Sequence, residues 1–563
     1  MVDTTESLNA EAPPYRLSPA WLLVPILLIG AYWRLRLLGE VAYWFDESFC
    51  LKMAEFPISE ILVRCASDTH PPFYFLLLKF WGAVFGTSPV AARGLSVICG
   101  LATIAGTFLF VREAYRPQVS RSTSDRRDEL RRSSETALTA AALVALSPFQ
   151  IEWSLMVRMY APLATLAVFS AWFLMRALRR PGPRRLDWTS FTITAILLAY
   201  THYFGLFTLA AEFSFAGIYV WRYGATSESR IGAQEPIERV GQAPLGDMNS
   251  SSLDLSLRAG PRFTTGCRFS RARPLFISAV VVVTAWSLWV KNFLEQRERV
   301  VDNFWSRPLD WDGIGNIFFQ IFAVHEWEPA PAFAGLIIAQ AAVVGIVLVL
   351  SRGRPGDVLV ALAASLPFVA VIGISLLGRN ILFARYLLSG HLFLLIAGAV
   401  LLSRVPFWPL RSCTILLVLG GMSLLSWKHY ERRERLAHLP GMQQAIGRFE
   451  EARQPGEQLI VCDPMLFTSV WAYSRHRNDC FVNGAEYPFF HGTAVLRDSD
   501  YFPRERLDNG TCPPVWTLDA NNWLGSNWAV PMPPEWKVVG DWRFPEYYCG
   551  ELVLRMWERP TDE

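Results

Sequence analysis

The sequence has few charged residues for its length. Of 563 residues only 18% are Asp, Glu, Lys or Arg, whereas 52% are hydrophobic, a balance that disfavours a soluble fold. Residues 275–290 and 330–350 carry no charge at all. Helices of roughly 20 apolar residues are long enough to cross a bilayer, so we predict an integral membrane protein.

Other absences exclude further classes of protein. The net charge of +3 is too small to predict a nucleic-acid partner, and no Cys or His spacing matches a zinc site. We find no internal repeat, whereas many transporters are built from two related halves. The first apolar stretch lacks a small-residue cleavage site followed by a soluble domain, so we interpret it as a retained anchor.

Apolar residues recur with helical spacing in eleven segments. They predict an all-α polytopic membrane protein with about eleven transmembrane helices. The predicted spans are residues 18–36, 89–111, 137–151, 158–177, 188–203, 205–222, 274–292, 331–350, 357–377, 386–403 and 408–426.

Arginine-rich loops predict the orientation of these spans. The loops are residues 112–132, 176–185, 258–273 and 351–357. All four face the cytoplasm if the amino terminus does, as the positive-inside rule requires. An odd number of spans then places the chain beyond the last span outside, and we predict the inner (plasma) membrane of a bacterium as the location.

Two domains follow from this topology. We predict a transmembrane catalytic region over residues 1–426 and a small extracytoplasmic α/β domain over residues 427–563. Within the second domain, residues 428–452 have a polar, helix-like pattern, and residues 458–462 and 551–556 are short apolar runs typical of strands.

Several segments outside the spans are distinctive. Residues 40–88, the first external loop, mix acids, aromatics and prolines, and residues 73–85 within it are apolar but too short to span, which predicts an interfacial helix. A second external loop is predicted at residues 291–330. Residues 116–135 and 225–260 are rich in small and charged residues, and we predict that both are flexible.

Six of the nine cysteines fall on the predicted oxidising side. They are Cys50, Cys65, Cys462, Cys480, Cys512 and Cys549. Cys50 and Cys65 could pair within the first loop, and the other four allow two disulfides in three connectivities. Unpaired buried thiols are the alternative, because pairing depends on geometry that spacing does not reveal.

An acid pair, Asp46 and Glu47, follows the first predicted span. A carboxylate there could act as a general base that takes the proton of an acceptor hydroxyl; ordinary solvation of a loop is the alternative. His70, which precedes two prolines, closes the same loop. An imidazole there can donate hydrogen bonds to a phosphate, or be an ordinary loop residue.

Five more residues lie at predicted external turns. They are Arg158, Tyr160, His202, Arg385 and Tyr386. Arginine at membrane depth is costly unless it is paired or lines a polar cavity, so Arg158 either serves a ligand or pairs with Glu152. Guanidinium groups bind phosphate through a bidentate fork, and we predict that Arg158 and Arg385 bind a phosphate leaving group with help from His70 and His202.

Together these motifs resemble the GT-C membrane glycosyltransferases, specifically glycosyltransferase family 39, which includes protein O-mannosyltransferases and lipid A aminoarabinose transferases. The resemblance extends over the membrane region and, more weakly, the tail. The motifs are residues 44–47 (WFDE), 70–72 (HPP), 92–96 (ARGLS), 158–160 (RMY), 201–203 (THY) and 385–386 (RY).

The resemblance implies a GT-C fold and a sugar donor carried on a polyprenyl or dolichyl phosphate. It implies that Asp46 is the catalytic carboxylate, that Glu47 helps to orient acceptor or sugar, and that His70 lies near the lipid phosphate. Ser48 and Phe49 stand where the aminoarabinose transferases have a basic residue, and no β-trefoil domain like that of the eukaryotic mannosyltransferases is inserted. The identities of the sugar and of the acceptor are therefore not predicted.

The predicted function is transfer of a sugar from a polyprenyl-phosphate donor to a hydroxyl of a lipid, protein or glycan acceptor on the outer face. Inversion is expected with Asp46 as the single base, because retention needs a second carboxylate as nucleophile. No cofactor or metal is predicted, since two adjacent acids without further clustered ligands make a poor metal site. A transporter or flippase of lipid-linked sugars is the main alternative, and a non-catalytic scaffold is a third.

Overall fold

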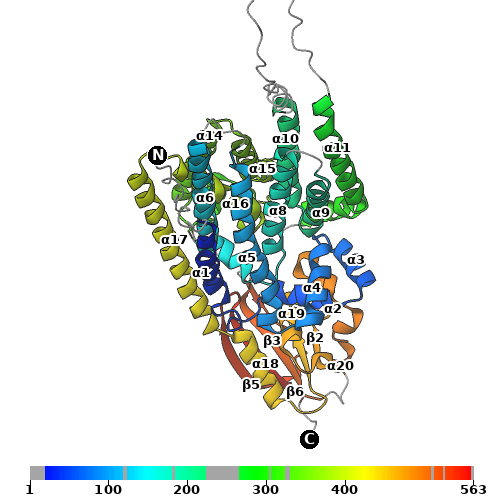
Figure 1. The fold of residues 1–563 in the computed structure, drawn as a ribbon. Coiled ribbons are helices and arrows are strands. Elements are labelled where there is room, and N and C mark those ends of the chain that lie inside the picture. The colour runs from blue at the N-terminus through cyan, green and yellow to red at the C-terminus, as the bar shows by residue number, and fades with distance from the viewer. Residues whose placement is uncertain are drawn as a thin grey trace, which may run out of the picture.

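A computed structural model describes residues 19–117, 123–180, 184–223, 266–303, 306–323, 330–508, 513–523 and 526–559. Long helices form a bundle, and a smaller domain of helices and strands is joined to one end of it (Figure 1). We call this the domain end, and the opposite end the arginine-rich end.

A helix lies at each of the eleven segments predicted as spans. The bundle consists of α1 (Leu23–Leu35, after the 3₁₀ turn Pro19–Leu22), α5 (Pro89–Ala114), α6 (Thr123–Leu146), α8 (Tyr160–Arg179), α9 (Arg185–Thr201), α10 (Gly205–Tyr223), α11 (Gly266–Ser287), α14 (Ala332–Leu350), α15 (Pro355–Leu377), α16 (Leu388–Ser403, after the 3₁₀ turn η2, Ala384–Leu387) and α17 (Trp408–Ala437).

Six of these helices are long and apolar enough to cross a membrane, and a seventh span is added if α11 and the next helix, α12 (Val290–Asn303), form one span bent by 60°. Others are short for a span; α9, for example, has 17 residues, against roughly 20 for a straight crossing. The predicted helical membrane fold is confirmed, whereas length and composition support fewer spans than eleven among the described residues.

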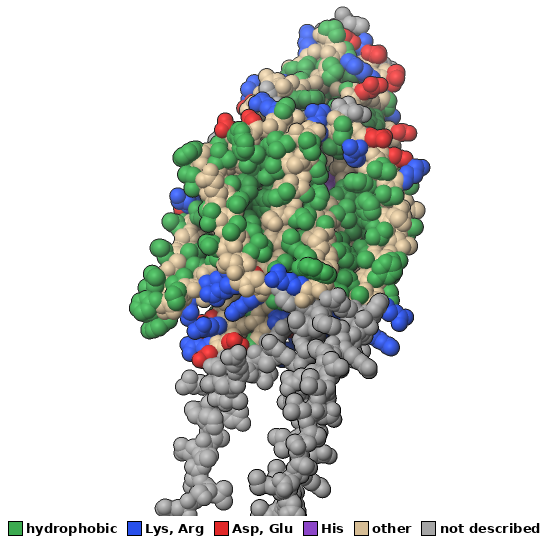
Figure 2. Space-filling model, turned by 90° about the horizontal axis from the view of Figure 1, so that it is seen from above, with side chains coloured by type: hydrophobic (Ala, Val, Ile, Leu, Met, Phe, Trp, Pro, Cys, Tyr) green, Lys and Arg blue, Asp and Glu red, His purple; other side chains and the backbone are tan. Residues whose placement is uncertain are grey.

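Apolar side chains cover the outside of the bundle. Helices α14 and α17 expose many of them, such as Val343, Val347, Leu416 and Leu417. Figure 2 shows a broad hydrophobic band, with Lys and Arg gathered along one edge and acidic and basic side chains mixed beyond the other. Such a band exceeds the apolar patches of soluble monomers and suits a lipid environment.

Ion pairs connect the helices at the arginine-rich end. They join Arg180 to Glu113, Arg176 to Asp187 at 2.9 Å, and Arg404 to Asp357 at 2.7 Å. Helix α6 begins at Thr123, so the prediction of a flexible segment over residues 116–135 is wrong for its second half, where the polar sequence continues an apolar helix. The other segment predicted as flexible, residues 225–260, lies outside the described residues.

Short helices form the domain end of the bundle. They are α2 (Phe45–Glu55), α3 (Ile58–Ser67), α4 (Phe73–Phe85) and α7 (Pro148–Ser154). Helix α4 coincides with the predicted interfacial helix. The second predicted loop contains α12 and α13 (Trp311–Gln320).

The C-terminal domain is a mixed sheet with helices, as predicted. Its strands are ordered β2-β1-β3-β6-β5, with β4 on β3; β1 pairs in parallel with β2 and β3, and the other pairs are antiparallel. Helix α17 continues beyond residue 426 to Ala437, so the predicted polar helix is divided between α17 and α18. The elements are α18 (Gly441–Ala452), β1 (Gln458–Val461), α19 (Pro464–Tyr473), β2 (Cys480–Val482), α20 (Glu505–Asp508), β3 (Val515–Trp523), β4 (Ser526–Trp528), β5 (Lys537–Glu546) and β6 (Gly550–Glu558).

The cysteines of the predicted oxidising side are free thiols where they are described. These are Cys50, Cys65, Cys462, Cys480 and Cys549, all of them buried. The structure therefore has the alternative arrangement of unpaired buried thiols at these five positions, and Cys512 lies outside the described residues.

Candidate active site

Asp46 lies in the first turn of α2, close to the C-terminal domain. The Thr468 hydroxyl of α19 donates to the Phe45 carbonyl at 3.4 Å, and Lys52 of α2 pairs with Asp500 at 3.1 Å. Two contacts from the C-terminal domain therefore fix the helix. The Asp46 side chain is 23% exposed, and its Oδ2 lies 3.7 Å from Nη2 of the buried Arg158.

Glu47, the neighbouring acid, is directed into the protein. Its carboxylate accepts two hydrogen bonds from Arg93 of α5, at 2.8 and 2.7 Å, and both side chains are buried. It also accepts from the Trp44 amide at 3.3 Å, which caps α2, and from the Val157 amide at 2.9 Å. Glu47 thus connects α2, α5 and the turn before α8.

Arg93 itself is held by the backbone that leads into α2. Its guanidinium donates to the carbonyls of Leu38 and Val41, each at 2.8 Å, and of Ala42 at 3.1 Å. With the Glu47 carboxylate, these carbonyls saturate the buried guanidinium. The pair Arg93–Glu47 therefore sets the position of the chain that carries Asp46.

Arg158 lies in the turn between α7 and α8. Besides Asp46, it contacts the Cys50 sulfur through Nη1 at 3.4 Å and the Tyr160 hydroxyl through Nη2 at 3.5 Å. The alternative that Arg158 pairs with Glu152 is wrong: Glu152 faces α17, where it lies 2.8 Å from the His429 imidazole.

Cys50 is a neutral neighbour of Arg158. Burial raises the pKa of the Cys50 thiol to about 12, although Arg158 lowers it. The sulfur therefore stays protonated near neutral pH, and it packs beside the guanidinium as a weak polar contact rather than as a nucleophile.

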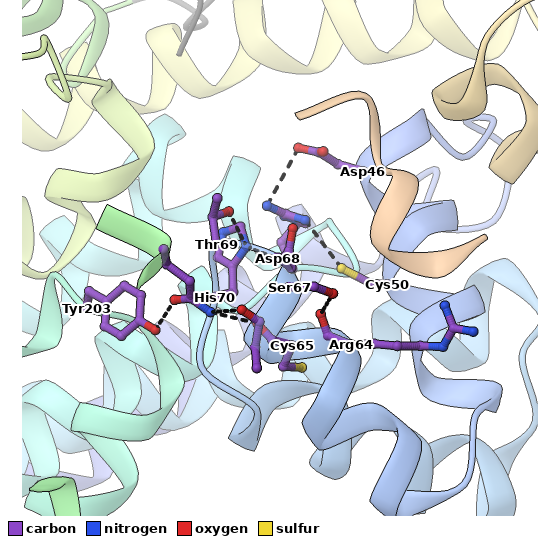
Figure 3. Close-up of polar contacts among 12 residues, drawn as sticks. Asp46, Cys50, Arg64, Cys65, Ser67, Asp68, Thr69, His70 and Tyr203 are labelled. Carbon is purple, nitrogen blue, oxygen red and sulfur yellow. Dashed lines mark hydrogen bonds and ion pairs between the residues drawn. The ribbon is translucent and has the colours of Figure 1, made fainter. Parts of the chain in front are cut away.

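His70 is oriented by the residues immediately before it. Its Nδ1 lies 2.9 Å from Asp68 Oδ2 and 3.1 Å from Thr69 Oγ1, and Figure 3 shows Asp68, Thr69 and His70 on the same side as Asp46 and Cys50. A carboxylate at Nδ1 fixes the orientation of the ring. His70 also packs against His202, with ring centroids 5.6 Å apart.

Aromatic rings connect Arg158 with Arg385. The Tyr160 ring lies 5.7 Å from His202 and 6.3 Å from Tyr386, and His202 lies 5.2 Å from Tyr386. The Arg385 guanidinium lies 5.4 Å from the Tyr386 ring. Arg385 is 8% exposed, so both arginines are buried beside one cluster of rings.

The structure thus brings all eight predicted site residues together from four separate parts of the chain. Seven of them surround the Arg158 side chain or the ring cluster, whereas Glu47 is directed to Arg93. Arg93, Cys50 and Asp68 contact this site but were not among the predicted site residues. Arg93 is a charge within an apolar segment, which is the signal that could have identified it, and Asp68 lies two residues from His70.

No three His, Cys, Asp or Glu side chains among the described residues form a group suited to a metal ion. Metal independence stays a prediction.

Comparison with known proteins identifies the fold. No family model and no curated protein matches the sequence. The structure is similar to ArnT from Cupriavidus metallidurans, both in the apo state and bound to undecaprenyl phosphate; each match has a TM-score of 0.54 at 13% identity and covers 95% of this chain and 97% of that chain. A weaker match is the archaeal oligosaccharyltransferase AglB from Archaeoglobus fulgidus, with a TM-score of 0.49 at 12% identity, covering 89% of this chain and 69% of that chain.

The likeness to ArnT extends over both the bundle and the C-terminal domain. The chain therefore has the GT-C membrane glycosyltransferase fold, which confirms the fold that its motifs implied, and it is an integral membrane protein with several apolar spans.

Proposed function

We propose that this protein transfers a sugar from a polyprenyl-phosphate donor to a hydroxyl acceptor at the outer face of the membrane. The observation that carries the proposal is the pair Asp46–Arg158, 3.7 Å apart, beside a buried cluster that also contains Arg385, His70 and His202. A carboxylate and several basic groups next to an apolar bundle suit a lipid-linked phosphate ester. The ArnT structure with bound undecaprenyl phosphate supports this class of donor.

The donor phosphate would bind to the basic groups. Arg158 and Arg385 are buried, and charge interactions are stronger there than in water. As the bond between the anomeric carbon and the phosphate oxygen breaks, the oxygen gains negative charge, and fixed guanidinium groups stabilise that charge without rearranging. His70, oriented by Asp68, adds a further hydrogen-bond donor.

Asp46 would act as the general base. The acceptor oxygen forms a bond to the anomeric carbon, its proton passes to the Asp46 carboxylate, and the lipid phosphate leaves with the electron pair of the broken bond. Asp46 is partly exposed, whereas Glu47 is saturated by Arg93 and backbone amides. A single available carboxylate favours one displacement with inversion, and we assign Glu47 a positioning role.

The test compares wild-type protein with Asp46→Asn, purified in nanodiscs with a polyprenyl-phosphate sugar and candidate acceptors identified from lipid and glycan analysis of cells with and without the protein. Loss of a general base lowers turnover by about 10² to 10⁴-fold. Glu55→Gln is the matched control, because Glu55 is exposed on the same helix and pairs with Arg477 at the surface. Equal product formation by Asp46→Asn would contradict the proposed base, and a retained anomeric configuration would contradict the single displacement.

The same experiment separates the enzyme from a flippase. A flippase moves lipid-linked sugar across a bilayer and forms no glycosylated product. If the purified protein moves the donor lipid between leaflets of a vesicle without making product, the transferase proposal is overturned.

A further inference from the structure

A second concentration of charge lies where α17 meets α7 and the C-terminal domain. Arg432 and Arg433, near the end of α17, are each 4% exposed. Arg432 donates to the Tyr547 hydroxyl at 3.3 Å and lies 3.8 Å from Glu152, which also pairs with His429. One carboxylate therefore serves two basic side chains.

No carboxylate among the described residues pairs with Arg433 alone. Its Nε and Nη2 are buried and have no hydrogen-bond partner among the described residues. The acids within electrostatic range are Glu152 and Glu47, and both are engaged, Glu152 by His429 and Arg432 and Glu47 by Arg93. Burying a hydrogen-bond donor without an acceptor costs free energy. A negatively charged acceptor beside this guanidinium would lower that cost.

A second donor in the same region also lacks an acceptor. The indole N–H of Trp44, the residue before α2, is buried and has no partner among the described residues. The Trp44 ring packs on Tyr548 at 5.3 Å, and Tyr548 is within electrostatic range of Arg433. Among the described residues, Glu152 is shared by His429 and Arg432, and Glu47 is taken by Arg93. The acid next to Tyr548, Glu546, accepts from the Tyr548 and Cys549 amides.

We propose that Arg433 and Trp44 belong to a binding site for a phosphate-type anion, separate from the residues assigned to the donor phosphate. A planar guanidinium with two available N–H groups matches phosphate oxygens. On α17, Arg433 lies about one turn beyond Tyr430 and two turns beyond Trp427, and the Arg36 guanidinium lies 3.3 Å from the Tyr430 ring. Such aromatic and basic residues occur at the level of lipid headgroups, so the phosphate can belong to a lipid or to a soluble molecule.

The test measures the unfolding midpoint of the full-length protein in detergent, because a ligand that binds only the folded state raises it. Inorganic phosphate is titrated at constant ionic strength against chloride, and a short-chain phosphatidylglycerol is titrated in parallel against the matching phosphatidylcholine. Wild type is expected to be stabilised by phosphate, by phosphatidylglycerol, or by both. The first response identifies a soluble phosphate and the second a lipid headgroup.

Arg433→Gln is expected to weaken this response by about tenfold or more in apparent affinity. Arg435→Gln is the matched control, since Arg435 is exposed two residues away on the same helix. If Arg433→Gln does not fold, Arg433→Lys and Trp44→Phe replace it, and each should weaken the response in part. The proposal is overturned if neither phosphate nor phosphatidylglycerol stabilises wild type, or if the variants respond as wild type does.

Discussion

The two ends of the helical bundle use buried charge differently. At the arginine-rich end, acids pair with arginines across neighbouring helices. These pairs are Arg180 with Glu113, Arg176 with Asp187, and Arg404 with Asp357. At the domain end, the cluster around Tyr160 combines two buried guanidinium groups, two imidazoles and a partly exposed carboxylate, those of Arg158, Arg385, His70, His202 and Asp46. Charge at the first end holds helices together, whereas at the second end it is gathered around one cluster of rings, as expected where a ligand binds.

The largest expected effect in this comparison concerns Arg93, a domain-end arginine that we assign to structure. Arg93→Gln leaves the Glu47 carboxylate and three backbone carbonyls without their donor. Removing one partner of a buried pair costs about 3 to 5 kcal/mol, so the unfolding midpoint should fall strongly. Arg112→Gln, at an exposed position of the same helix, is the control, and an equal midpoint for the two variants would show that Arg93 is dispensable.

For Arg158 we expect an effect on donor binding rather than on stability, because we assign this residue to the ligand. Arg158→Gln should weaken donor binding by roughly 10 to 100-fold, the worth of a hydrogen bond to a charged group, as measured by the KM for the donor. Arg158→Lys keeps the charge but loses the bidentate geometry of the guanidinium. Its KM for the donor should lie between those of wild type and Arg158→Gln. A KM unchanged in both variants would argue that Arg158 only orients Asp46.

Apolar runs and motifs are local signals, so the sequence predicted the helices and selected residues that the structure places near one another. The roles of those residues stay predictions. The sequence could not separate the two adjacent acids. Successive residues of a helix point about 100° apart, so Asp46 and Glu47 face different surroundings, and which of them meets Arg93 depends on the packing of α2 on α5.

Two further details depended on tertiary structure. Glu152 and Arg158 lie close in sequence, yet Glu152 belongs to α7, which faces α17, and Arg158 belongs to the following turn. The predicted boundary between bundle and tail follows the last apolar span at residue 426, but α17 continues beyond it to Ala437, since polar residues extend a helix outside the membrane.

A smaller effect is expected at the opposite end. Arg404→Gln removes the ion pair to Asp357, which is 2.7 Å long, but Asp357 keeps its bonds from the Tyr115 hydroxyl and the Arg354 amide. The expected loss is about 1 to 2 kcal/mol in the free energy of unfolding, with no change in the KM for the donor. A donor KM that rose as much as in Arg158→Gln would contradict the division of roles between the two ends.

The smallest effect concerns the Cys50 thiol, which tests how closely the domain end is packed. Because burial raises its pKa to about 12, about one thiol in 10⁴ is ionised at pH 8 in the folded protein. Maleimide labelling followed by peptide mass spectrometry should therefore be slow in native protein and fast after unfolding. Because the pKa of the thiol is higher in the folded than in the unfolded protein, its contribution to stability is fully present below the unfolded pKa of about 8.5. This contribution is lost as pH rises through about 12. Labelling at equal rates in folded and unfolded protein at pH 8 would show that the contact between Arg158 and Cys50 opens readily, and that the site is less rigid than its hydrogen bonds indicate.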